Sequence, residues 1–161
     1  MKTADIKKTA LEFLNDPERI TAVIGSCPTD GNTHVATVYY YVDDHFNFYF
    51  LTATNTQKHR NLLENPNAAI VVGFGPSYTT VQGQGAAVLL EKNSAEERES
   101  IAHLKKRLVD HNNETWPIFL LDDYIDQSIA VFKFVPETLQ LLNLERDNQL
   151  PITTDDTLQI L

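Results

Sequence analysis

The order of the expected elements predicts an α+β fold, mainly β, in which antiparallel strands close into a barrel with helices at its flanks. Stretches rich in β-branched and aromatic residues recur along the chain and are separated by turn signals, which is typical of strands. Helical spacing occurs near residues 5–15, 55–64 and 94–110, so strands and helices do not alternate as in a doubly wound parallel sheet. A length of 161 residues fits one domain.

The first half of the chain predicts a helix and three strands. Apolar side chains recur at helical spacing over residues 5–15. Strands are predicted at 20–27 and 33–42, because both stretches have strand composition and the turn cluster PTDGN lies between them. The alternating stretch FNFYFLT predicts a third strand, with Phe46 and Phe48 on one face. It follows a short turn, so the second and third strands form a predicted hairpin.

The middle of the chain predicts a short helix and two further strands. The helix covers residues 55–64, and the apolar stretch 67–74 predicts a buried strand. The stretch YTTVQGQGAAVLLE (78–91) predicts a long strand. Gly83 and Gly85 within it indicate a bulge, a bend or the close approach of another backbone.

The last part of the chain predicts a longer helix and the strand that completes the core. Ser94 and Glu97 form a capping box at the start of that helix. A short segment is expected at 117–123. Residues 127–144 predict a strand that is broken or bent at Pro136.

Composition excludes several classes of function. The net charge of −9, from 22 acidic and 13 basic residues, argues against nucleic acid or an anionic membrane as a partner. Without an apolar leader or a long apolar run, a cytoplasmic protein is expected. No repeat or linker divides the chain, so residues 1–145 predict a single domain and residues 146–161 a peripheral C-terminal tail. The five histidines lack metal-ligand spacing, and no metal site is predicted.

A cluster of cationic side chains follows the third predicted strand. Lys58, His59 and Arg60 lie in the first turn of a predicted helix, where the helix dipole disfavours positive charge. The pattern from Thr54 to Gln57 is a capping box that begins the helix near residue 55. Free backbone N–H groups therefore lie beside these cations, as in an anion site.

Two interpretations of this cluster remain open. In the first, a phosphate is bound by the backbone N–H groups together with the side chains of Thr54, Thr56, Gln57 and Lys58. A phosphate bound there would attract the lysine, so a position that the helix dipole makes unfavourable for a cation would become favourable. In the second, the helix is solvated, Lys58 is exposed, and the cations pair with Glu64 or Asp43.

Polar and aromatic side chains are concentrated on two predicted strands. Thr37 and Tyr39 share one face of the second strand, which is either a half-buried sheet surface or a wall for a planar ligand. Thr80, Gln82 and Gln84 share one face of the fifth strand. Because glutamine offers a donor and an acceptor together, this face is either a solvated surface or a contact for a ring edge with carbonyl and N–H groups.

The chain resembles the FMN-binding split-barrel family related to pyridoxamine 5′-phosphate oxidase. The resemblance lies in ATVYYYVDDHFNFYFLTATNTQKHRNLLENPNAAIVV, followed by YTTVQGQGAAVLLE and the late FKFVPETLQLL, and covers about residues 5–145. It implies an antiparallel split β-barrel of Greek-key type with flanking helices. It also implies FMN as the cofactor and a homodimer with flavin at the subunit interface.

The resemblance further implies the residues of an FMN site. The start of the short helix would hold the phosphate, although the oxidase has arginines at the positions of Gln57 and Ala36. The implied contacts are Thr56, Gln57 and Lys58 to the phosphate, Thr52 and Ala53 along the ribityl chain, Thr37, Val38 and Tyr39 at the isoalloxazine edge, and Thr80 and Gln82 on the fifth strand.

Three functions are compatible with these features. The first is an FMN-dependent oxidoreductase acting on a small molecule, in which flavin carries the redox chemistry and no catalytic side chain is identified. The second is a non-catalytic flavin-binding or stress-related protein, and the third binds another planar anionic ligand such as haem. The C-terminal Arg and His motif of the oxidase has no counterpart in LERDNQLPITTDDTLQIL, so a true pyridoxamine 5′-phosphate oxidase is not expected.

Overall fold

The computed structural model describes residues 3–73, 79–111, 128–143 and 157–161. Its strands are β1 (Thr21–Ser26), β2 (His34–Val42), β3 (Phe48–Ala53), β4 (Asn67–Val72), β5 (Thr79–Leu89), β6 (Ile129–Asn143) and β7 (Thr157–Gln159). Its helices are α1 (Thr3–Leu14), α2 (Gln57–Glu64) and α3 (Ala95–His111). The order of helices and strands predicted from the sequence is confirmed for these residues.

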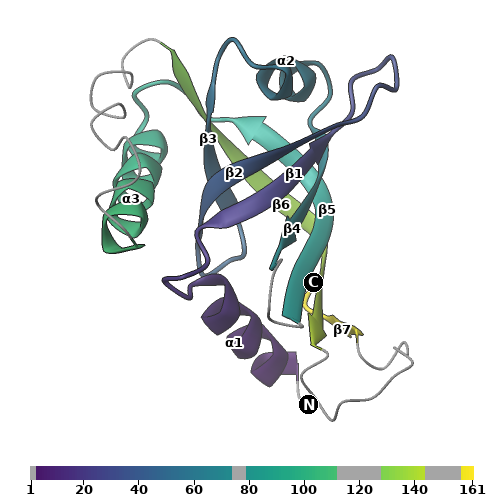
Figure 1. Ribbon diagram of the computed structural model, residues 1–161, viewed down its shortest axis with the longest axis vertical. Coiled ribbons are helices and arrows are strands. Elements are labelled where there is room, and N and C mark those ends of the chain that lie inside the picture. The colour runs from purple at the N-terminus through teal and green to yellow at the C-terminus, as the bar shows by residue number, and fades with distance from the viewer. Residues whose placement is uncertain (1–2, 74–78, 112–127, 144–156) are drawn as a thin grey trace.

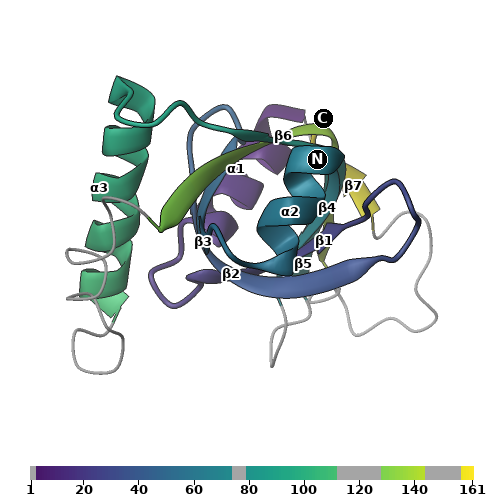
Figure 2. The same ribbon diagram turned by 90° about the horizontal axis from the view of Figure 1, so that it is seen from above.

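Six antiparallel strands close into a barrel with helices around it (Figures 1 and 2). Around the ring the strands follow the order β3-β2-β1-β4-β5-β6, and the pairing of β3 with β6 closes the ring. The predicted hairpin of β2 and β3 is present. The predicted α+β, mainly antiparallel split barrel is therefore confirmed.

The inside of the barrel is a packed core. Every second side chain of a strand points inward, and the inward positions of β2, β3 and β6 carry large apolar groups. The largest fully buried side chains there include Tyr40, Phe48, Phe50, Phe132 and Phe134. The hydroxyl of Tyr40 donates to the carbonyl of Leu14 at 2.6 Å, which satisfies the polar atom in the core. Because side chains fill the interior, a ligand site has to lie at an end of the barrel or outside it.

The three described helices cover different parts of the barrel. Figure 1 shows α2 at one end and α1 at the other, with α3 standing beside the strands. Asn61 of α2 donates to the hydroxyl of Ser26 on β1 at 3.2 Å, and Leu62 enters the core. Leu104 and Leu108 form the buried face of α3. In the described part of the chain, no helix is both long and apolar enough to cross a membrane.

The third strand begins later than predicted. Phe46 lies in the turn before β3, with a left-handed backbone at φ 65°, and its side chain is buried. The carboxylate of Asp43 accepts hydrogen bonds from the backbone N–H groups of His45 and Asn47, each at 2.9 Å. This carboxylate fixes the turn, so the strand starts at Phe48 rather than at Phe46.

The predicted irregularity of the fifth strand is a bulge shared with β6. Gln84 faces Thr138 across the two strands, whereas Gly85 faces Pro136, so Glu137 has no partner in the register. A Cβ atom on Gly85 would lie 2.7 Å from the Cα of Pro136, so only glycine allows this approach. The closing strand is bent here and not broken.

Two further predictions concern the second half of the chain. Ser94 caps α3 by accepting a hydrogen bond from the Glu97 N–H at 3.1 Å, while the Glu97 carboxylate accepts from the N–H of Asn93 at 2.6 Å. The segment predicted at 117–123 lies outside the described residues. The tail was expected to be peripheral, but β7 pairs with β6 and Ile160 is buried, because the apolar end of the chain extends the sheet.

Candidate functional site

The start of α2 is fixed to the end of β3 by threonine hydroxyls. Thr56 is the N-cap, and its hydroxyl accepts a hydrogen bond from the N–H of His59 at 3.2 Å. The same hydroxyl donates to the carbonyl of Ala53 at 2.9 Å and lies 2.9 Å from the hydroxyl of Thr52. The predicted capping box that began at Thr54 is therefore wrong, since these contacts with β3 select Thr56 as the cap.

Lys58 is a buried cation in the first turn of α2. It lies on the helix face that Asn61 and Leu62 turn toward the barrel, and it is 8% exposed. Among the described residues, no group accepts a hydrogen bond from its ammonium and no carboxylate pairs with it. Burial lowers the pKa of this ammonium below its usual value. The expectation of an exposed lysine is therefore wrong, and an anion would satisfy a charge that the described protein leaves unpaired.

The side chain of Gln57 is already engaged at both ends. Its amide nitrogen donates to Asn61 at 2.7 Å, and its amide oxygen accepts from Arg60 at 2.9 Å. Arg60 also donates to the carbonyl of Asn55 at 3.1 Å. In contrast, no described group accepts the backbone N–H of Gln57 or of Lys58. Residue 57 would thus contact an anion through its backbone.

The ion pairs expected for a solvated helix do not form in the described structure. Glu64 accepts a hydrogen bond from the backbone N–H of Thr29 at 3.0 Å, and Asp43 bonds within its own turn. The cations of α2 are therefore not neutralised by these two carboxylates. The pKa of His59 is lowered by burial and by the nearby charge of Arg60. The first turn of α2 thus keeps the local positive character that favours an anion.

A pocket of about 190 Å³ lies between α3 and the barrel, next to the start of α2. Its lining consists of Tyr39, Leu51, Thr52, Ala53, Leu104, Leu108 and Ile129. Three of these residues, Tyr39, Thr52 and Ala53, were predicted from the sequence as cofactor contacts. Thr52 and Ala53 also bond to Thr56, the N-cap of α2, so the pocket adjoins the first turn of that helix. We call this pocket and the first turn of α2 the α2 site.

The remaining predicted residues of β2 differ in accessibility. Thr37 is exposed on the outer face of the strand, beside the α2 site. Val38 is 4% exposed and belongs to the core inside the barrel. A ligand on this strand would therefore contact the backbone of Val38 and the side chain of Thr37, because neighbouring strand residues point to opposite faces.

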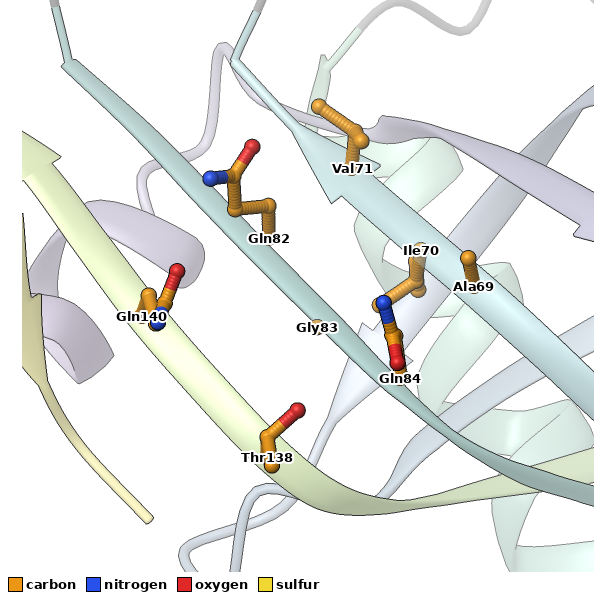
Figure 3. Close-up of a pocket in the computed structure, with 8 residues that line it drawn as sticks. All are labelled: Ala69, Ile70, Val71, Gln82, Gly83, Gln84, Thr138 and Gln140. Carbon is orange, nitrogen blue, oxygen red and sulfur yellow. The ribbon is translucent and has the colours of Figure 1, made fainter.

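Thr80 and Gln82 lie on the other side of the barrel. In the ring of six strands, two strands separate β5 from β2 in either direction. On the outer face of β5 and β6, Gln82 and Gln84 lie beside Gln140 and Thr138, and Figure 3 shows these side chains around Gly83. We call the surface of these four polar residues the amide face. It borders a pocket of about 350 Å³, and none of the described residues that line this pocket is charged.

Comparison with known proteins now identifies the family. Residues 6–143 match the model of the pyridoxamine 5′-phosphate oxidase family. The protein belongs to this family. The predicted resemblance is confirmed, and the match spans the whole barrel from α1 to the end of β6.

Solved structures share the fold of this pyridoxamine 5′-phosphate oxidase family member at low sequence identity. A conserved hypothetical protein from Mycobacterium tuberculosis is 20% identical, with 96% of this chain and 91% of that chain covered and a TM-score of 0.68. General Stress Protein 26 from Bacillus anthracis is 18% identical (84% and 92% covered, TM-score 0.62). HutZ, the haem storage protein from Vibrio cholerae, is 18% identical (82% and 91% covered, TM-score 0.67). No curated protein matches the sequence.

Sequence reasoning missed part of the α2 site of this family member. Nothing local in the sequence indicates that Leu104 and Leu108 of α3 would line the same pocket as Thr52. Leu51 pairs with Val131, and Ile129 pairs with Ala53, where β3 and β6 close the ring, which depends on contacts between distant parts of the chain. Within the described ranges, no three His, Cys, Asp or Glu side chains come together as metal ligands.

Proposed function

We propose that the protein is an FMN-dependent oxidoreductase that acts on a small molecule and binds the FMN phosphate at the start of α2. The observation that carries the proposal is the largely buried side chain of Lys58, whose ammonium has no partner among the described residues. It lies beside the free backbone N–H groups of Gln57 and Lys58. A phosphate there would accept charge-assisted hydrogen bonds and neutralise the buried cation.

The rest of the flavin would lie along residues that the α2 site already brings together. From a phosphate on α2, the ribityl chain would pass Thr52 and Ala53 at the end of β3. The ring would then lie against the outer face of β2, near Thr37 and Tyr39. These residues bind and orient the cofactor, while bound FMN would supply the hydride or electron transfer.

A second copy of the chain would complete this site. The pocket of about 190 Å³ is smaller than the roughly 300–1,000 Å³ of clefts that enclose ligands of drug size. The predicted contacts Thr80 and Gln82 belong to the opposite side of the barrel and do not reach the same ligand within one chain. In a two-fold homodimer, the amide face of each copy would cover the α2 site of the other, giving two equivalent flavin sites.

Haem is the second candidate ligand, because HutZ from Vibrio cholerae, a haem storage protein, has this fold. Haem iron takes its axial ligand from side chains such as His, Cys, Met or Tyr. Of these residue types, the described residues that line the α2-site pocket include Tyr39 alone. The phosphate-directed cation Lys58 therefore favours flavin over haem.

The test is a titration of the ligand-free protein with FMN, riboflavin and haemin, followed by fluorescence or absorbance. Riboflavin lacks the phosphate, and a hydrogen bond to a charged group contributes about 1.5–3 kcal/mol, so FMN should bind roughly 10- to 100-fold more tightly. Equal affinity for the two flavins would contradict the phosphate site. Haemin binding without flavin binding would establish the second candidate. Reduction of bound FMN by NADH or NADPH, with turnover, would separate an oxidoreductase from a flavin carrier.

A further inference from the structure

We propose that the pocket between α3 and the barrel binds a neutral, apolar, ring-sized group of the protein's substrate. The inference rests on the proposed function, because it places the substrate beside the flavin contacts Thr52 and Ala53. It adds the chemical class of the substrate, which neither the fold nor the family specifies.

The lining of the pocket selects against charge. Four aliphatic side chains form most of its wall, namely Leu51, Leu104, Leu108 and Ile129. The remaining described lining residues are Tyr39, Thr52 and Ala53, so none of the described lining side chains is charged in a protein of net charge −9. The Thr52 hydroxyl is also engaged with Thr56. A charged group would lose its hydration here without gaining a partner, whereas an apolar group would gain from burial.

The volume of the pocket sets the size of the group. Apolar cavities of about 150 Å³ lined by Leu, Ile and Phe bind benzene. A pocket of about 190 Å³ with aliphatic walls therefore fits a single six-membered ring with a small substituent. A nucleotide or a flavin ring system would not fit inside it. The pocket is thus matched to one part of a small molecule, and the rest of that molecule would lie outside it.

The wall formed by α3 is held in place by contacts at a distance from the pocket. Leu104 and Leu108 are 1% and 4% exposed. One turn along, Arg107 donates to the carbonyls of Leu14 at 3.2 Å and Arg19 at 2.6 Å, which ties α3 to the connection between α1 and β1. A wall fixed in this way is formed before the ligand arrives, so little ordering is required on binding.

The pocket shares two lining residues with the position expected for the cofactor. Thr52 and Ala53 belong both to the pocket lining and to the hydrogen-bonded link between β3 and the first turn of α2. A ring in the pocket would therefore lie next to the ribityl and ring end of FMN, while a polar reacting group of the same substrate would face the flavin. The apolar part of the substrate would thus be bound in the pocket, and the part that reacts would lie beside the flavin.

The experiment compares three probes of similar size by ligand-observed NMR: toluene, benzoate and benzylamine. Each is titrated into the FMN-free and the FMN-loaded protein, and FMN affinity is measured on the same samples. Toluene should bind both forms of the protein. Benzoate and benzylamine should bind with at least about 10-fold lower affinity, because transfer of an unpaired charge into the pocket is costly. Equal affinities for the three probes, or loss of toluene binding once FMN is bound, would overturn the proposal.

Two substitutions locate the binding. Ile129→Trp fills the pocket from the half-buried start of β6 and should reduce toluene affinity at least about 10-fold. Val109→Trp adds the same ring on the exposed side of α3 and should leave the toluene affinity unchanged. If Ile129→Trp does not fold, Leu51→Phe provides the filled pocket. Unchanged toluene binding in a folded variant with a filled pocket would show that toluene binds elsewhere, and would overturn the proposal. If the unmodified protein does not bind FMN, the proposed function is overturned instead.

Discussion

Among single residues, Lys58 determines most of the character of the α2 site. It is buried and, within the described structure, unpaired, so it makes the ligand-free protein less stable. Sequence alone identified this lysine but placed it in solvent, because its burial depends on how α2 packs across the end of the barrel. The same burial strengthens its interaction with an anion, since the effective dielectric constant is lower there than in water.

Replacing this lysine should affect FMN and stability in opposite directions. Lys58→Met should weaken FMN binding by about 10- to 100-fold, leave riboflavin binding unchanged, and raise the free energy of unfolding without ligand. Flavin titrations and urea denaturation measure these effects. Lys106→Met removes one exposed cation on α3 and is the matched control for net charge. An equal loss for FMN and riboflavin would show that Lys58 does not contact the phosphate.

The lowered pKa of Lys58 also predicts a pH dependence. Between its folded pKa and its usual value of 10.5, the unfolded chain binds more protons at this residue than the folded chain does, so its contribution to stability rises with pH. The stability advantage of Lys58→Met should therefore shrink as the pH rises through this window. Urea denaturation of both proteins from pH 7 to pH 10.5 measures the difference. A constant or growing advantage would contradict a Lys58 pKa that burial lowers.

At the level of helices and strands, the hydrogen-bonded links between elements explain where sequence analysis succeeded and failed. Ser94 was identified correctly because its cap is local to α3. The start of α2 was misplaced because Thr54 and Thr56 are both plausible caps in sequence. The bonds from Thr56 to Thr52 and Ala53 decide between them, and these depend on the path of the chain after β3. Local signals were sufficient where the deciding contact was local.

The bulge between β5 and β6 provides a test at this level. Gly85→Ala would place a Cβ atom against the carbonyl of Val135 and 2.7 Å from the Cα of Pro136. Because both contacts are backbone, neither can move freely, and the free energy of unfolding should fall by about 1–3 kcal/mol. Gly25→Ala is the control, since its nearest neighbour, Ala69, would lie at 3.9 Å. Similar losses in the two variants by urea denaturation would contradict a specific requirement at the bulge.

For the whole molecule, the closure of the barrel decides how the candidate site is assembled. The strand pattern and the turn signals were enough to predict an antiparallel barrel. The pairing of β3 with β6, which includes the stacked rings of Phe50 and Phe132, joins segments far apart in sequence and has no local signal. The individual site residues could therefore be predicted from the sequence. Their division between two sides of the barrel could not be predicted. That division makes a second copy necessary for a flavin site that uses both sides.

The homodimer can be tested by adding charge to the amide face. Gln84 is exposed beside a pocket whose described lining residues are uncharged, and a two-fold interface would duplicate any charge placed there. Gln84→Glu should therefore convert a dimer into monomers at micromolar concentration in analytical ultracentrifugation and weaken FMN binding, while the thermal midpoint of the monomer fold changes little. Ala102→Glu adds the same charge on the exposed side of α3 and should leave the dimer intact.

A Gln84→Glu protein that remained dimeric with full FMN affinity would exclude the amide face from the interface. A monomeric unmodified protein that bound FMN would confine the flavin to the α2 site of a single chain.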